Sequence, residues 1–264
     1  KKFLTILYQL HNRVFDDNDK VMDANEEIKN NIYRFIDNNE STAIIVDCEN
    51  SDVYKLYSVL KNLNKEEISK IKKIILYDDY HTNNTWKLLS KMVNIKTERI
   101  EVERVTDAKS LVDIKMTAGV CRAFYEENIQ SFILVSSDSD FWGLISSLPE
   151  ANFIVMIEYD KCGANIKRVL KENSIYYCSI DDFCSGNIED IKNLALKTAL
   201  LEVISEFNAT GIWPDMDYRH FVDTLYMRCH IEPTQAERKR FIDKYIKTLS
   251  FTADIDGKFC IKIK

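Results

Sequence analysis

Two clusters of acidic residues, far apart in the sequence, could do chemistry together. The first contains Asp47, Glu49 and Asn50, and the second contains Asp138 and Asp140. An aspartate can also cap the helix that follows it, and this role explains one acid in each cluster. It leaves the other acids unexplained. Carboxylates that converge repel each other, and hard oxygen ligands without His or Cys select Mg²⁺ or Mn²⁺.

A third acid, Asp113, stands among apolar residues near the start of a helix predicted over residues 108–128. Lys109 and Thr117 share its helix face at a spacing of four residues. A surface salt bridge between Lys109 and Asp113 is the plain alternative. Taken with the two clusters, Asp113 is expected to join a metal site. Metal ions bound in this way orient a phosphate and activate water, so the residues indicate phosphodiester hydrolysis.

Short apolar runs must position these acids. Such runs are typical of strands that are buried on both faces, and helical patterns lie between them. Strands that alternate with helices predict a parallel α/β sheet, whose strand ends meet at one edge. The run at 100–103 alternates more, which favours a position near a sheet edge. The predicted strands are 43–46, 73–77, 100–103, 132–135, 153–157 and 175–178, and the predicted helices between them are 52–68, 84–93, 108–128, 140–148 and 163–172.

The two ends of the chain differ from the middle in their pattern of apolar residues. Helical spacing predicts an N-terminal helical segment, residues 1–40, before the α/β domain of residues 41–186. Residues 187–264 predict a small C-terminal domain that resembles a winged-helix module. Its predicted elements are helices at 189–207, 217–230 and 234–249, then a β-hairpin around Asp256-Gly257.

The composition limits the classes of function. The 264 residues carry a net charge of −6, and all of it lies before Asn187, because the later part has 12 basic and 12 acidic residues. An acidic domain that handles a polyanion needs cations. Seven cysteines without a Cys-x-x-Cys pair indicate a reducing, cytoplasmic location. No apolar run reaches the roughly 20 residues that span a membrane, and no signal peptide is expected.

Three segments resemble the signature motifs of NYN domains, which belong to the PIN-like nuclease superfamily. They are Ile44–Asn50, Lys109–Asp113 and Leu134–Phe141, in that order. The resemblance covers residues 42–184 and implies a PIN-like, Rossmannoid sheet flanked by helices. It also implies a metal-dependent endoribonuclease with RNA as substrate and Mg²⁺ or Mn²⁺ as cofactor.

The resemblance assigns roles residue by residue. Asp47, Asp113, Asp138 and Asp140 would be catalytic acids that bind the metal. Asn50 would position the metal water or the substrate, and Ser137 would support the acidic loop near the substrate. The family often has Gly where this chain has Ser110, which leaves the role of Lys109, a candidate substrate contact, open. Glu49 would be a further ligand or a solvated neighbour. Cys48 fits a buried cysteine better than a nucleophile.

Other readings stay open. Arg240, Lys244 and Lys247 could guide RNA by contacting phosphates, or could form a solvated helix face. Trp213 and Tyr218 could stack on bases or pack in the core. The terminal helical regions could bind a protein partner or form a homo-oligomer. A catalytically inactive NYN-like module that binds RNA or protein, a Toprim-like domain and a metal-dependent adhesion site are the alternative functions.

Overall fold

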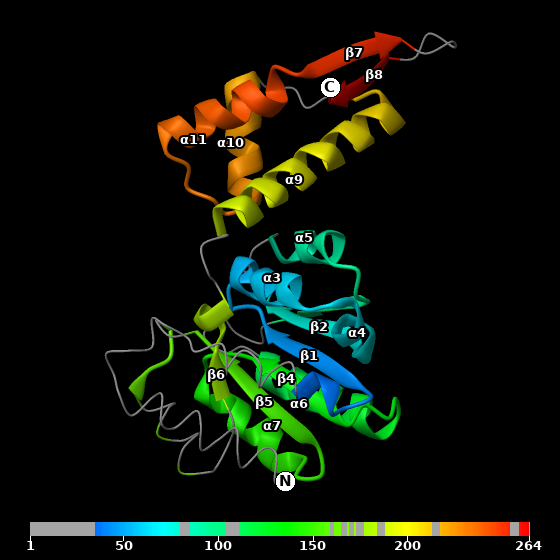
Figure 1. The fold of residues 1–264 in the computed structure, drawn as a ribbon, viewed down its shortest axis with the longest axis vertical. Coiled ribbons are helices and arrows are strands. Elements are labelled where there is room, and N and C mark those ends of the chain that lie inside the picture. Colours follow the sequence, from blue (N-terminus) through cyan, green and yellow to red (C-terminus); the bar gives the residue numbers. More distant parts are fainter. Residues whose placement is uncertain are drawn as a thin grey trace. The chain divides into compact units, whose positions relative to one another are not determined.

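The computed structural model describes residues 35–79, 85–103, 111–158, 161–164, 168, 172, 177–183, 188–212, 217–253 and 259–263 (Figure 1). The chain divides into two compact units, residues 1–82 with 93–188, and residues 83–92 with 189–264. The predicted N-terminal helices lie almost wholly outside the described residues. Within the part that is described, no helix is long and apolar enough to cross a membrane.

The first unit is built on a six-stranded sheet in which every neighbouring pair of strands is parallel. The strand order is β3-β2-β1-β4-β5-β6. The central strands are apolar and buried, as predicted from their continuous runs. The strand predicted to lie near an edge, β3, is indeed an outer strand and is the most exposed of them. The strands are β1 Thr42–Asp47, β2 Ile71–Asp79, β3 Thr97–Val102, β4 Ser131–Val135, β5 Asn152–Ile157 and β6 Tyr177–Ser179.

Helices cover both faces of this sheet, with α6 (Val112–Tyr125) and α7 (Trp142–Ser147) on one side (Figure 1). The other side carries α3 (Val53–Asn62) and α4 (Lys65–Lys70). One helix was predicted over 52–68, and this is wrong, because Asn64 starts a new helix with a capping box. The predicted helix at 163–172 lies mostly outside the described residues.

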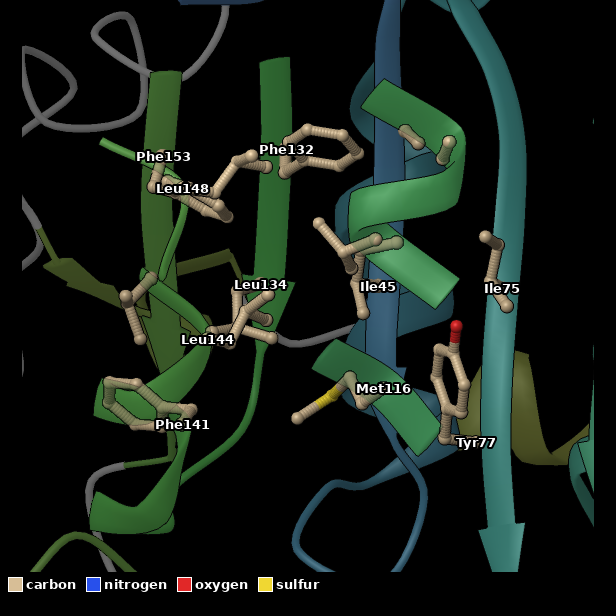
Figure 2. Packing of buried hydrophobic residues seen from close by; sticks show 14 of the residues in the cluster. Ile45, Ile75, Tyr77, Met116, Phe132, Leu134, Phe141, Leu144, Leu148 and Phe153 are labelled. Carbon is tan, nitrogen blue, oxygen red and sulfur yellow. The ribbon is translucent and has the colours of Figure 1, made fainter. Parts of the chain in front are cut away.

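The main core lies between the sheet and α6 with α7 (Figure 2). Side chains alternate along a strand, so every second residue faces these helices. Ile45 of β1 and Tyr77 of β2 therefore face Met116 of α6. A Cβ added at Gly119 would lie 1.8 Å from the hydroxyl oxygen of Tyr77, so the helix approaches the strand closely here. This packing places the N-terminal turn of α6 near the carboxyl end of β1.

The second unit contains α9 (Ile188–Thr210), α10 (Tyr218–Arg228) and α11 (Gln235–Phe241). A π-helical segment, Ile242–Ile246, continues α11 and leads into the antiparallel hairpin β7 (Leu249–Ala253) and β8 (Phe259–Ile263). These elements agree with the predicted three helices and hairpin. The likeness to a winged-helix module stays a prediction. The helix between β2 and β3, α5 (Thr85–Met92), belongs to this unit.

Candidate metal and phosphodiester site

Asp47 ends β1 and is almost completely buried, with 2% of its surface exposed. The Asn50 side chain donates a hydrogen bond to its Oδ2 at 2.9 Å, and the Ser136 hydroxyl donates to the same oxygen at 2.7 Å. Burial raises the pKa of Asp47, although these hydrogen bonds to Asn50 and Ser136 work in the opposite direction. The carboxylate is thus fixed in place by Asn50, which sequence reasoning included, and by Ser136, which it missed.

The acids after β4 are tied to Asp47 by the same serine. The Ser136 Oγ accepts a hydrogen bond from the backbone N–H of Asp138 at 3.1 Å. The Asp138 Oδ1 in turn accepts from the N–H of Asp140 at 3.1 Å, at the start of a short 3₁₀ turn. Asp138 therefore also caps the helical turn that follows it, which is the alternative role considered for one acid of each cluster. Asp140 is exposed.

Asp113 lies in the first turn of α6 and joins the other acids electrostatically. Its pKa is raised to about 6, first by burial and then by the negative charges of Asp47, Asp138 and Asp140. Thr117 donates to the backbone carbonyl of Asp113 rather than to its carboxylate. The four predicted acids, which come from three separate segments, therefore lie close enough at the carboxyl edge of the sheet for their charges to interact.

The donor set suits a hard divalent cation, since it consists of carboxylate oxygens. Among the described residues, however, no three acidic, His or Cys side chains already stand close enough to hold a metal ion. Binding an ion would thus require these carboxylates to turn towards one another. Burial, and then the negative charges of the three other acids, raise the pKa of Asp113, and a cation at this edge would relieve the repulsion among the acids.

A second polar cluster lies on the opposite face of the same sheet edge. The Ser137 side chain is nearly buried, and its hydroxyl accepts a hydrogen bond from the backbone N–H of Glu158 at 2.9 Å. Lys55 bridges Glu158 at 3.3 Å and Asp181 at 2.5 Å. Burial works against the charge on Lys55, but Asp181 and Glu158 raise its pKa overall. Sequence reasoning missed this network, because its members are far apart in the chain.

The end of β2 adds a buried ion pair that was also missed. Asp78 is fully buried, and Arg99 of β3 binds its Oδ2 through both Nε and a terminal nitrogen. Burial raises the pKa of Asp78, and Arg99 opposes this shift. Cys48 is buried nearby, and burial raises the pKa of its thiol well above the usual value. This agrees with a buried cysteine rather than a nucleophile.

The other predicted contacts lie elsewhere. Lys109 and Ser110 fall outside the described residues, and Glu49 is exposed. Arg240, Lys244 and Lys247 belong to the second unit, which is described by itself. Arg240 and Lys244 line a hollow that also holds four acids, Glu189, Asp190, Glu232 and Glu237. Lys247 forms an ion pair with Asp243 at 2.6 Å. Their role in substrate binding stays a prediction, as does that of Ser137.

A wholly parallel sheet with acids at its carboxyl edge and helices on both faces places the first unit among the α/β proteins and agrees with a PIN-like fold. The family model for the NYN domain matches residues 41–181, so the chain belongs to the NYN domain family, within the PIN-like nuclease superfamily. A crystal structure of a protein of unknown function from Vibrio parahaemolyticus is similar, with 16% sequence identity and a TM-score of 0.41. The matched region covers 56% of this chain and 96% of the Vibrio protein. No curated protein matches the chain.

Ser136 can be tested against its neighbour Ser137. If Asp47 is a metal ligand for RNA cleavage, as the family resemblance implies, Ser136→Ala should lower the rate by about 10- to 100-fold, because residues that orient metal-binding carboxylates have effects of this size. Ser137→Ala should change the rate less than about 3-fold, because its hydroxyl faces Glu158 instead. Steady-state kinetics of both variants with a short fluorescent RNA would decide. Equal losses of rate would contradict the role of Ser136, and a higher KM only in Ser137→Ala would support substrate contact there.

Proposed function

We propose that this protein is a metal-dependent endoribonuclease, with residues 41–186 as its catalytic domain. One observation carries the proposal. Four aspartates from three segments of an NYN domain interact electrostatically at one sheet edge, where burial first and these charges second raise the pKa of Asp113 to about 6.

Each residue would have a distinct task. Asp47, Asp113, Asp138 and Asp140 would hold Mg²⁺ or Mn²⁺. When bound, such an ion supplies an activated water and neutralises charge on the phosphate. Asn50 and Ser136 position Asp47, and Ser136 also positions the backbone of Asp138. The described residues of the first unit include no histidine, so we assign no separate protein base.

The substrate would be RNA, approached in the cytoplasm, with Arg240, Lys244 and Lys247 as candidate phosphate contacts. The net charge of −6 makes cations outside the acidic edge necessary for a polyanionic substrate. A homo-oligomer or protein complex through the terminal helical regions belongs to the same proposal. So does the division into an N-terminal segment, residues 1–40, and a C-terminal domain, residues 187–264.

One observation favours the alternative, an inactive NYN-like module that binds RNA or protein. Among the described residues, no three potential ligands are already arranged to hold a metal ion. An active enzyme would bind the ion together with substrate, and an inactive one would not bind it at all. Metal binding therefore separates the two functions.

The deciding experiment incubates the full chain with labelled single-stranded RNA or DNA, in Mn²⁺, Mg²⁺ or EDTA. Cleavage of RNA that needs the metal and disappears in Asp138→Asn would support the endoribonuclease. Asp138→Asn keeps the size of the side chain, so circular dichroism should show an unchanged fold. If no substrate is cut and both proteins bind RNA equally, the catalytic proposal fails and the binding module takes its place.

A further inference from the structure

A groove between α10 and α11 in the second unit has features that fit a polyanion. It encloses about 550 Å³, a size suited to a small ligand or part of a larger one. Its apolar lining includes Val222, which is buried, and Ile242, which is partly exposed. Polar residues from both helices surround this apolar strip. All the lining residues belong to one compact unit.

The charge in this groove is positive. Four cations line it, namely Arg219, Arg238, Lys239 and Lys247. Two acids also line it, so the net charge is about +2 in a chain whose overall charge is −6. Asp223 binds Arg238 at 2.7 Å and Asp243 binds Lys247 at 2.6 Å, which holds these two cations in place. Arg219 and Lys239 are exposed and form no ion pair among the described residues.

An exposed aromatic side chain stands in the same groove. Tyr218 is 54% exposed, so core packing, which the sequence left open for it, is not its role. The Arg219 Nε donates a hydrogen bond to the Tyr218 hydroxyl at 3.4 Å, which associates the ring with a cation. A flat aromatic face beside cations is the arrangement on which single-stranded nucleic acids bind, with a base on the ring and phosphates on the cations.

The hollow on the other side of α11 provides a contrast. It is lined by Arg240, Lys244 and Lys192, but also by four acids, so its net charge is about −1. Two of its aromatic residues, Tyr226 and Phe241, are buried and pack against each other in an edge-on arrangement. The third, Tyr245, is partly exposed, and the Lys244 Nζ lies over its ring at 5.1 Å from the centroid. That hollow has no excess of positive charge, and Lys244 already lies over its one partly exposed ring. Of the two, the α10–α11 groove suits a polyanion better.

We infer that the α10–α11 groove is a docking site for single-stranded RNA, separate from the acidic edge of the NYN domain. Arg219, Lys239 and the two paired cations bind phosphates, and Tyr218 stacks on a base. The inference rests on the proposed function for the identity of the nucleic acid. The inference goes beyond the proposed function by placing RNA affinity in this groove, with Tyr218, Arg219 and Lys239, and not in the hollow of Arg240 and Lys244.

The test measures binding of a fluorescent 20-nucleotide single-stranded RNA to the full chain by anisotropy in EDTA, where metal-dependent cleavage cannot occur. The double variant Arg219→Glu/Lys239→Glu should bind at least about 10-fold more weakly. The slope of log Kd against log salt concentration should fall by about 1.4, because two phosphate contacts are lost. The control Lys197→Glu/Lys262→Glu changes the net charge equally on exposed residues outside the groove and should bind within about 2-fold of wild type.

Substitutions of Tyr218 distinguish base stacking from electrostatic attraction to phosphates. Tyr218→Ala should weaken binding about 5-fold or more, whereas Tyr218→Phe, which keeps the ring, should bind nearly as wild type. Equal losses in the groove and control variants would overturn the inference, because net charge alone would explain them. Normal RNA binding by the groove variant, with loss of binding to a poly-glutamate peptide, would also overturn it and point to an acidic protein partner. Since binding is measured without metal, these results stand even if the protein cuts no RNA.

Discussion

An Asp113→Asn variant is expected to lose metal-dependent RNA cleavage by about 100-fold or more, while its metal-free form becomes more stable than wild type. Both effects have one cause. Burial, and then the negative charges of three other acids, raise the pKa of Asp113 to about 6. The charged carboxylate is therefore unfavourable in the metal-free protein, and a bound cation would relieve the part of this cost that comes from repulsion. The amide keeps the shape and removes the charge.

The direction of the pH dependence follows from the shift. The folded-state pKa of about 6 lies above the ordinary value of 3.8, so the folded state favours the protonated acid. The stability from this group is therefore complete below about pH 3.8 and is lost as the pH rises through about 6. The gain in Asp113→Asn is present above pH 6 and disappears in acid. For a half-buried group screened by solvent, we expect about 1 kcal/mol, or 2–4 °C in Tm.

Thermal melts of the two proteins in EDTA at pH 7.5 and pH 4 would measure this. Adding Mn²⁺ at pH 7.5 should raise the Tm of wild type more than that of Asp113→Asn, since the variant lacks one ligand charge. Asp140→Asn is the control, because Asp140 is exposed and should change Tm less. A lower Tm for Asp113→Asn than for wild type at pH 7.5 in EDTA would show that the Asp113 carboxylate is not repelled by its neighbours.

The sheet and the four acids could be predicted because their signals are local. A parallel strand buried on both faces is a continuous apolar run, such as Phe132–Val135. The acids stand directly after such runs, and parallel strands bring their carboxyl ends to one edge. The exception was the helix expected over 52–68. Leu63 continues the apolar pattern, but the capping box of Asn64 with Glu67 starts a second helix.

The residues that hold the acids in place could not be predicted, because their partners are distant in sequence. Ser136 and Ser137 look equivalent in the chain. Strand alternation sends the first to Asp47 and the second to Glu158, so only the sheet register distinguishes them. The pairing of Lys55 with Glu158 likewise depends on α3 lying beside the end of β5. The sequence gives the type of each polar residue, but its hydrogen-bond and ion-pair partners are known only once the fold is known.

The grouping of α5 with the second unit is a further case. Its sequence reads as an ordinary crossover helix between two parallel strands. Its partners include Arg228, whose carbonyl accepts from Thr85, and Glu202, which binds Lys91 at 2.6 Å. Neither contact has a local signal. The boundaries of compact units can therefore differ from those that the order of elements in the sequence suggests.

Gly119 gives the largest expected effect on stability, and Gly119→Ala should destabilise the protein by about 3 kcal/mol. Alanine in a helix would normally stabilise by up to about 1 kcal/mol relative to glycine. Here the new Cβ would lie 1.8 Å from the Tyr77 hydroxyl oxygen and 3.0 Å from Cζ of its ring. Tyr77 is fully buried in β2, so it has no room to move away, and overpacking exceeds the gain in helix propensity.

Removing the hydroxyl should restore much of this loss. Tyr77→Phe alone should be nearly neutral, because the buried hydroxyl has no hydrogen-bond partner among the described residues. In the double variant Tyr77→Phe/Gly119→Ala the contact at 3.0 Å remains, so rescue should be partial. Gly143→Ala in α7 is the control, since nothing lies within 4 Å of its added Cβ, and it should be neutral or stabilising. Urea unfolding of wild type, Tyr77→Phe, Gly119→Ala and the double variant forms a double-mutant cycle. Equal destabilisation by Gly119→Ala with and without the tyrosine hydroxyl would show that the clash lies elsewhere on the helix.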